Sequence, residues 1–349
     1  MNKNKFGIIT IITIVIALSI LILSKTSILA NLDLAYNGIN EKNIETIIDD
    51  IESGENILIF DNTTRTDLNY FIDRIYDSPD LFWLSMRYTS ISIGNVSILH
   101  IEDKYDSISD KKEFVETKLN EIIKSIVTDN MSNYEKTLKI HDWICDNITY
   151  GEIKNDGDQE IYGALSTYTA RCAGYAKLFT CLLDKVGIES YVISGDAIDS
   201  NGDTIAHAWN LVNIDGKNYY FDITWNDHDT KNGTTYYWFA VKEDEFKNKH
   251  FPNDGYDWIS DNNDEDNYYI KNNMYLSKYN YMNIVNQIQK QGKTFTIKCK
   301  NKEVLNQTMK ALGNKDELQK IMRATGITYI EEIIYEEEPS VNCLKVTIK

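Results

Sequence analysis

"HAWNLVNIDGKNYYFDITW", residues 207–225, contains two strand-like runs that are separated by Asp215 and Gly216. An Asp-Gly pair between two such runs predicts a β-hairpin that is closed by a two-residue turn. In this turn the flanking residues Ile214 and Lys217 face each other. That pair fixes the register of the residues before and after it.

The register of this hairpin brings a histidine and a carboxylate to the same face. Counting from the turn, His207 lies opposite Thr224, and Trp209 lies opposite Asp222. His207 and Asp222 are then diagonal neighbours whose backbones are about 7–8 Å apart, a distance that side chains can close to a hydrogen bond. A three-residue turn would put them on opposite faces. An unpaired aspartate in a packed aromatic strand is costly, so Asp222 needs a partner.

A second stretch, "TARCAGYAKLFTCLLDKVG" at residues 169–187, predicts a helix that starts with a cysteine. Apolar residues recur at helical spacing from Cys172 onward, and Gly187 is typical of the residue that follows a helix. A thiol in the first turn faces unpaired backbone N–H groups and the positive end of the helix dipole, which both favour the thiolate. Cys181, nine residues later, points to the opposite side of the helix and cannot share this role.

The three residue types together predict nucleophilic catalysis. A carboxylate that is bonded to one imidazole nitrogen leaves the other nitrogen to exchange a proton with a nearby thiol. We therefore predict Cys172 as the nucleophile, His207 as the general base and acid, and Asp222 as the residue that orients the imidazole.

The remaining histidines and cysteines have simpler interpretations. Three other histidines could compete as the base: His141, His228 and His250. His228 lies in a polar loop and His250 precedes Phe-Pro at a helix end, so neither has a carboxylate placed beside it. Cys145 is predicted in a helix core, and Cys299 and Cys343 in structural strands. No CxxC pair occurs, which disfavours a structural zinc site, and we predict neither a metal nor a cofactor.

The stretches quoted above at residues 169–187 and 207–225, together with "GIESYVISGD" and "YYWFAVKEDEFKNKHFP", resemble the transglutaminase-like superfamily in its bacterial extracytoplasmic branch. The resemblance covers roughly residues 130–255 and is specific in its Cys…HAWN…DxTW pattern. It implies an α+β fold with a papain-like core, in which the cysteine helix packs on an antiparallel sheet. It also implies the nucleophile, base and orienting roles for Cys172, His207 and Asp222.

Two features of the resemblance concern residues near the nucleophile. Animal transglutaminases have Gly-Gln-Cys-Trp where this chain has Ala-Arg-Cys-Ala, so the second oxyanion donor is unassigned. Tyr168 is one candidate for this donor. Trp209 is another, although a packing role is an equal interpretation for it. Gly174 and Tyr175 match the bacterial pattern, which implies close packing and a polar contact. The calcium-site loops of the animal enzymes are not recognisable.

Length, composition and charge bound the class of protein. The 349 residues are enough for two or three domains with a sizeable core, and 42% hydrophobic residues fit an ordinary globular protein. The formal net charge of −17 argues against nucleic-acid binding, because phosphates would be repelled. Protein or peptide substrates remain compatible with this charge.

The N-terminus carries a targeting signal. Lys3 and Lys5 precede an uncharged run from Phe6 to Leu23, which is nearly long enough to cross a hydrocarbon core of roughly 30 Å. The preferred interpretation is an uncleaved membrane anchor with the rest of the chain outside the cytoplasm, and a secreted protein after signal cleavage is the alternative. The five cysteines are an odd number, so at least one thiol stays free outside the cell.

The chain divides into four predicted segments and a linker. They are an anchor or signal over 1–30, an N-terminal α+β (or α/β) region over 31–130, the transglutaminase-like core over 131–258, a solvated acidic linker over 260–267, and a small α+β domain over 268–349. In the N-terminal region we predict a helix over 64–77 and two strands within 81–102 that are joined near Gly94-Asn95. Ser132 and Glu135 predict a capping box.

The sequence therefore predicts an extracytoplasmic cysteine enzyme that acts on amide bonds of proteins or peptides through a thioester. Hydrolysis and transamidation are both open. The alternatives are a cysteine peptidase of cell-wall peptides and a non-catalytic surface protein that uses the same fold for binding.

Overall fold

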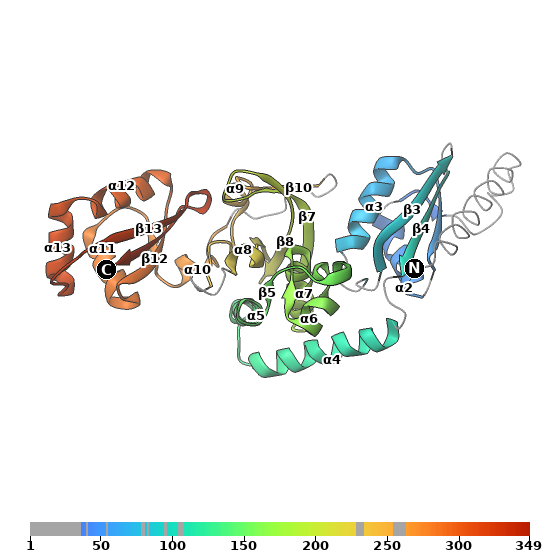
Figure 1. The fold of residues 1–349 in the computed structure, drawn as a ribbon, viewed down its shortest axis with the longest axis horizontal. Helices are drawn as coiled ribbons and strands as arrows, with labels where there is room; N and C mark the ends of the chain where they lie inside the picture. The colour runs from blue at the N-terminus through green and yellow to red at the C-terminus, as the bar shows by residue number, and fades with distance from the viewer. Residues whose placement is uncertain are drawn as a thin grey trace, which may run out of the picture. The chain divides into compact units, whose positions relative to one another are not determined.

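The computed structural model describes residues 36–39, 41–53, 55–77, 81, 84–93, 96–103, 108–227, 234–253 and 263–349. These residues divide into two compact units with a boundary between Phe114 and Val115. Both units combine helices with sheets (Figure 1).

The first unit is built on a four-stranded sheet in the order β1-β2-β4-β3. Its elements are β1 (Tyr36–Asn37), α2 (Glu41–Glu52), β2 (Ile57–Asp61), α3 (Arg65–Asp77), β3 (Leu84–Ile93) and β4 (Val96–Asp103). The antiparallel pairing of β3 with β4 confirms the two strands predicted within 81–102, although Gly94 and Asn95 lie outside the described residues. Helix α3 confirms the helix predicted over 64–77. Its Phe71 packs against Phe60 of β2, with ring centroids 5.4 Å apart.

Two helices precede the predicted catalytic core: α4 (Ile108–Ile126) and α5 (Asn133–Asn147). The predicted capping box starts α5. The backbone N–H of Glu135 donates to the Ser132 hydroxyl at 3.3 Å, and the Glu135 carboxylate accepts from the backbone N–H of Ser132 at 2.8 Å. Both contacts satisfy N–H groups that a helix start leaves unpaired.

The cysteine helix begins at the predicted residue. The chain passes through β5 (Thr149–Tyr150), η3 (Lys154–Gln159), α6 (Ile161–Thr167) and β6 (Thr169–Ala170) before α7 (Cys172–Asp184). Gly187 follows α7 with φ +73°, a backbone conformation that glycine adopts without strain. Gly174 lets α7 approach η3, because a Cβ there would lie 2.5 Å from the backbone oxygen of Asp158. This confirms the close packing predicted for Gly174.

Helix α7 packs on an antiparallel sheet with the strand order β10-β7-β8-β9. Its strands are β7 (Ser190–Ile198), β8 (Thr204–Ile214), β9 (Lys217–Phe221) and β10 (His250–Pro252), and the short helices α8 (Ile223–Asn226) and α9 (Glu243–Phe246) lie between β9 and β10 in sequence. The Asn210 amide donates to the Ala176 carbonyl at 2.9 Å and to the Thr180 hydroxyl at 3.0 Å, which ties β8 to α7. A cysteine helix on an antiparallel sheet is the architecture that the resemblance implies.

The C-terminal part of the second unit has its own four-stranded sheet, in the order β11-β12-β14-β13. Its elements are α10 (Tyr268–Lys271), β11 (Tyr275–Leu276), α11 (Tyr281–Gln291), β12 (Thr294–Cys299), α12 (Lys302–Leu312), α13 (Lys315–Thr325), β13 (Ile333–Glu338), η4 (Pro339–Val341) and β14 (Cys343–Ile348). Strand β13 begins at Ile333. The reason is that its partner β14 ends at Ile348, which pairs with Ile333.

The C-terminal part shares a hydrophobic cluster with the central sheet. Val341 and Cys343 belong to the same buried cluster as Trp209. Lys298 is 1% exposed, and its ammonium group lies 2.6 Å from the carboxylate of Glu245 in α9. These contacts hold the two parts in one unit, while the segment boundaries given above remain predictions.

The prediction of a solvated linker over 260–267 is wrong for the residues that the structure describes at its end. Asp266 and Asn267 are buried. Asp266 accepts a hydrogen bond from the Tyr219 hydroxyl at 3.0 Å, and the Asn267 amide donates to the Phe239 carbonyl at 3.2 Å. A run of polar side chains predicts a solvated segment, because composition alone does not reveal hydrogen-bond partners that lie far away in the sequence.

Two predictions concern the N-terminus and the cysteines. Within the described residues, no helix has the combination of length and apolar character that crossing a bilayer requires. The predicted anchor over Phe6–Leu23 lies outside those residues. All five cysteines are free thiols, and Cys299 and Cys343 are buried as predicted for structural residues.

We expect Gly174→Ala to lower the free energy of unfolding by about 1–3 kcal/mol, because backbone or helix must shift to accept the new methyl group. Urea titration of the purified variant measures this change. Gly313→Ala is the matched control, since its Cβ would meet nothing closer than 3.6 Å. Equal stability of the two variants would contradict the assigned role of Gly174.

Candidate active site

Cys172 is the first residue of α7 and lies in a partly open position. Its preceding residue, Arg171, is the N-cap and makes no side-chain cap hydrogen bond, so no side chain at the cap occupies the N–H groups of the first turn. The Arg171 guanidinium instead pairs with Asp158, and its backbone N–H donates to the Asp158 carbonyl at 2.7 Å. The thiol therefore lies at a helix start, where backbone N–H groups lack partners within the helix and the helix dipole is positive.

The predicted hairpin turn is confirmed. Asp215 and Gly216 have φ values of +52° and +85°, as a primed two-residue turn requires, and Ile214 pairs with Lys217. The ladder between β8 and β9 follows this register back to Asn210, which pairs with Phe221.

Beyond Phe221 the strand prediction fails. Asp222 does not pair with Trp209, and Thr224 does not pair with His207, because Asp222 caps α8. Its carboxylate Oδ1 accepts from the backbone N–H of Trp225 at 2.9 Å. Aspartate is a favoured N-cap residue, and this local contact replaces continued strand pairing.

The predicted hydrogen bond between His207 and Asp222 is nevertheless present. His207 Nε2 lies 2.7 Å from Asp222 Oδ2, and both side chains are buried. The imidazole also stacks on the Trp225 ring, with centroids 4.9 Å apart. Because Nε2 is bound to Asp222, Nδ1 is the nitrogen left to exchange a proton with a thiol.

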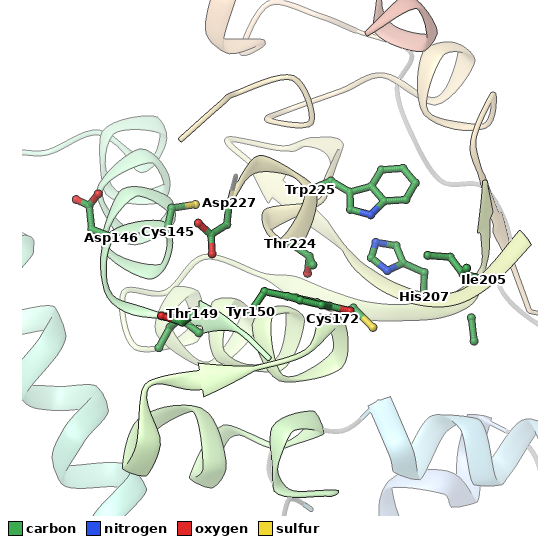
Figure 2. A pocket seen from close by; sticks show the side chains of 12 residues that line it. Cys145, Asp146, Thr149, Tyr150, Cys172, Ile205, His207, Thr224, Trp225 and Asp227 are labelled. Atoms are coloured by element: carbon green, nitrogen blue, oxygen red, sulfur yellow. The ribbon is translucent and has the colours of Figure 1, made fainter. Parts of the chain in front are cut away.

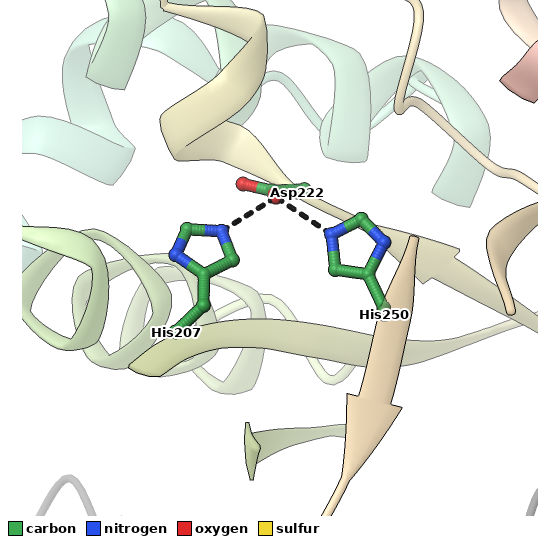
Figure 3. A group of neighbouring side chains, drawn as sticks. All are labelled: His207, Asp222 and His250. Carbon is green, nitrogen blue, oxygen red and sulfur yellow. Dashed lines mark hydrogen bonds and ion pairs between the residues drawn. The ribbon is translucent and has the colours of Figure 1, made fainter. Parts of the chain in front are cut away.

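A second histidine, His250, shares the same carboxylate oxygen. Its Nε2 lies 3.0 Å from Asp222 Oδ2, and Figure 3 shows Asp222 between the two imidazoles. The prediction that His250 has no carboxylate beside it is therefore wrong. Strand β10 carries His250 and pairs with β7, so the contact depends on residues more than 50 positions apart. The motif "YYWFAVKEDEFKNKHFP" includes His250, and it is the sequence signal that could have indicated this role.

The surroundings of His207 and Asp222 stabilise both side chains in their charged forms. Burial lowers the pKa of His207, but the charge and hydrogen bond of Asp222, with a further hydrogen bond to Cys172, raise it to about 10. Burial raises the pKa of Asp222, but His207 and His250 hold it well below its usual range. For His250, burial dominates and lowers the pKa against the opposing effect of Asp222. The expected state at neutral pH is a charged His207 beside an ionised Asp222 and a neutral His250.

Cys172 and His207 line the same pocket, which has a volume of about 490 Å³. Figure 2 shows them at one end, with Trp225 above His207, while Cys145 lies at the other end. The pocket is therefore large enough for a side chain or a short peptide segment beside the thiol.

The far end of the pocket is built by a separate polar group. Tyr175 donates a hydrogen bond to the Ile148 carbonyl at 3.0 Å and also contacts the Asp227 carboxylate. This confirms the polar contact predicted for Tyr175. Burial, followed by the charge of Asp227, raises the pKa of Cys145 well above its usual value, so this thiol stays protonated.

His141 does not act as a competing base in this arrangement. It is fully buried, its Nδ1 lies 3.0 Å from Asp142 Oδ1, and its Nε2 lies 3.1 Å from the Asn226 amide nitrogen and 3.8 Å from Cys145 Sγ, not beside Cys172. Both nitrogens are therefore occupied by partners that fix the ring. His228, the other predicted competitor, lies outside the described residues.

Neither candidate for the second oxyanion donor reaches the pocket among its described lining residues. Tyr168 is 46% exposed, and its carbonyl accepts from the Thr149 N–H at 2.8 Å. Trp209 is 1% exposed in the hydrophobic cluster, as the packing interpretation predicts.

His207, Asp222 and His250 also have ligand atoms within 4.8 Å of one another, a spacing that metal sites share. These atoms already form hydrogen bonds with each other, and all three side chains are buried. Hydrogen bonding explains the cluster without a metal, and no step of the chemistry derived below requires one.

Comparisons with known proteins agree with this architecture. Residues 120–225 match the model of a family described as the transglutaminase-like superfamily. One curated relative is Kyphoscoliosis peptidase of Mus musculus, which is 27% identical over 156 residues, covering 42% of this chain and 23% of that protein. The chain thus spans less than a quarter of the length of this relative.

Solved structures give partial likenesses. A TGase structure has a TM-score of 0.31 and 12% identity, covering 56% of this chain and 61% of that chain. A candidate cysteine protease from Cytophaga hutchinsonii has a TM-score of 0.29 and 14% identity, covering 52% and 68% of the two chains. The predicted α+β fold class is confirmed by the elements described above and by the family match.

We expect the stabilising effect of Asp222 to depend on pH. The pKa of His207 is raised from 6.5, so the pair contributes fully below pH 6.5 and loses its contribution as the pH rises to about 10. The pKa of Asp222 is lowered from 3.8, so the contribution is also lost in stronger acid. Urea titrations should therefore show the largest stability difference between wild type and Asp222→Asn near pH 5, with a smaller one at pH 9.

The control is Asp199→Asn, because the Asp199 carboxylate accepts from the backbone N–H groups of Asn201 and Asp203 and makes no hydrogen bond to an imidazole. Its stability difference from wild type should not change between pH 5 and pH 9. A difference for Asp222→Asn that is equally flat would mean that the carboxylate does not stabilise a charged imidazole.

Proposed function

We propose that this protein, whose residues 120–225 match the transglutaminase-like superfamily, is a cysteine enzyme that transfers acyl groups from amide bonds through a thioester. Cys172 is the nucleophile, His207 the general base and acid, and Asp222 the orienting carboxylate. One observation carries the proposal: His207 bonds Asp222 through Nε2 at 2.7 Å and interacts with Cys172, which lines the same pocket.

The reaction follows from the charges of these groups. The Cys172 thiolate attacks the amide carbonyl carbon, and the carbonyl electrons move to oxygen, where backbone N–H groups at the start of α7 can stabilise them. The intermediate then collapses, the C–N bond breaks, and His207 Nδ1 gives its proton to the departing amine. The product is a thioester on Cys172 and a neutral His207.

The second half of the reaction releases the acyl group. Water or an amine attacks the thioester while His207 accepts its proton, and the sulfur leaves as a thiolate. Water gives hydrolysis and an amine gives transamidation, and the residues required are the same. Asp222 keeps its negative charge throughout and alternately faces a neutral and a charged imidazole.

The substrate that fits is a protein or peptide. The pocket accepts a side chain, and Tyr150 and Trp225 offer flat aromatic surfaces in its lining. The name of the mouse relative, a peptidase, favours hydrolysis, and a peptidase of cell-wall peptides is the second candidate. A non-catalytic binding protein is the remaining alternative, and it would not need a charged imidazole next to a thiol.

The cellular location is part of this proposal. Lys3 and Lys5 before the apolar run Phe6–Leu23 support a membrane anchor with an extracytoplasmic enzyme, as in the bacterial branch that the motifs resemble. A secreted form after signal cleavage is the alternative. Protease protection of the full chain in membrane vesicles tests the orientation.

We expect iodoacetamide at pH 6 to alkylate Cys172 selectively in the purified full-length chain. The charged His207 stabilises the thiolate, whereas Cys145 stays protonated. Peptide mass spectrometry over time measures the rate at each cysteine. His207→Ala should remove the selectivity, and Cys145→Ser should leave the Cys172 rate unchanged. Slow and equal labelling of all accessible cysteines would support the non-catalytic alternative.

We expect amide cleavage to require Cys172 and to partition between water and added amine. Peptide libraries incubated with the full chain, with and without a primary amine, would be analysed by mass spectrometry for hydrolysed and amine-linked products. Cys172→Ser should lower either product by at least about a thousandfold, because the serine hydroxyl is a far weaker nucleophile at neutral pH. Products that persist in this variant would assign the activity to another residue.

A further inference from the structure

We propose that His250 is a positioning residue that holds the Asp222 carboxylate by a permanent hydrogen bond and limits how strongly Asp222 binds the proton of His207. This inference rests on the function proposed above. It assigns to the second imidazole a role in setting the range of pH over which the thiolate and the charged His207 coexist. His250 does not line the described part of the pocket, so it acts through Asp222 and not on the substrate.

The first support is the sharing of a single oxygen. His207 Nε2 and His250 Nε2 both lie within hydrogen-bond distance of Asp222 Oδ2, at 2.7 and 3.0 Å. Oδ1 is occupied by the backbone N–H of Trp225 at 2.9 Å. The carboxylate is therefore held from three directions, and each donor on Oδ2 reduces the negative charge available to the other.

The second support is the position of the proton on His250. Its Nδ1 lies 3.3 Å from the Phe246 carbonyl, so both ring nitrogens face acceptors. A neutral imidazole has one N–H, and the ionised Asp222 is the stronger and closer acceptor. The proton therefore resides on Nε2 and points to Asp222.

The third support is the enclosure of His250, which keeps the ring neutral. Phe246 stacks on it with centroids 3.8 Å apart, and Trp209, Trp225 and Trp238 have ring centroids within 5.0 Å. The titratable groups that contact it are Asp222 and His207. Lys249, the next residue before it, pairs with Glu338 at 3.2 Å.

Burial outweighs the attraction of Asp222 and lowers the pKa of His250, and the charge of His207 acts in the same direction. His207 therefore gains and loses a proton during the reaction, and His250 remains a fixed hydrogen-bond donor. The fixed donor weakens the hold of Asp222 on the proton of His207. A less tightly held proton is given more readily to the leaving amine.

The test is the pH dependence of Cys172 alkylation by iodoacetamide in the full-length chain, with His250→Phe and His250→Gln compared with wild type. Phenylalanine keeps the ring shape and the stacking on Phe246, but it removes the donor. Glutamine places an amide N–H near the position of Nε2 and cannot ionise. His141→Gln is the matched control, since His141 is an equally buried histidine whose ring nitrogens contact Asp142 and Asn226.

The alkaline limb of the profile is the change in alkylation rate as His207 loses its proton. We expect His250→Phe to move this limb to a pH higher by about half a unit or more, because Asp222 then holds the His207 proton more tightly. His250→Gln should keep the limb within about 0.2 pH units of wild type, and so should His141→Gln. With an amide substrate, His250→Phe should lower kcat and leave KM unchanged.

Two results would overturn the inference. An unshifted limb in His250→Phe, with only a lower melting temperature, would reduce His250 to a packing residue. An equal shift in His250→Phe and His250→Gln would mean that the N–H donor is not what matters. Failure of the proposed function is distinguishable from both, since it would remove selective Cys172 alkylation from the wild type itself.

Discussion

The buried negative charge of Asp222 is the constraint that organises the site. Its side chain has no exposure to solvent, and an ionised carboxylate without partners in such a place costs several kcal/mol or more. Three donors offset this cost: His207 from β8, His250 from β10 and the backbone N–H of Trp225 in α8. Because these donors come from separate elements, the chain must bring all three elements together before the charge is tolerated. The geometry that orients His207 is thus also a condition for folding.

The parts of the site that the sequence predicts are those set by short-range rules. Asp215-Gly216 fixes the hairpin register, and the apolar spacing after Cys172 fixes the start of α7. Asp222 shows where such rules compete. Its aromatic neighbours favour a strand, but the same residue type caps helices, and the cap prevails once the carboxylate can bind Trp225 N–H. Periodicity could not place His250, because a three-residue strand has none and its position depends on pairing with β7.

A glycine explains how β10 reaches the site. Gly195 of β7 pairs with both His207 of β8 and Pro252 of β10, and a Cβ there would lie 2.2 Å from the Phe251 carbonyl oxygen. The Trp209 ring would also be 2.8 Å away, so neither neighbour leaves room for a side chain. A glycine within a strand pattern is typical of a close backbone approach. Its position in "YVISGD", opposite the histidine of "HAWN", was therefore a sequence-level indication that another segment lies against this part of the sheet.

The two histidines differ in surroundings more than in their bond to Asp222. His207 is 6% exposed, borders the pocket and interacts with Cys172, whereas His250 is fully enclosed by aromatic rings. Enclosure disfavours charge on His250, while the ionised Asp222 and the neighbouring thiol favour charge on His207. The same carboxylate thus faces two imidazoles whose pKa values are pushed apart by their environments, as acid–base sites require. If both rings were equally exposed, the proton would be shared between them, and the one beside the thiol would carry it only part of the time.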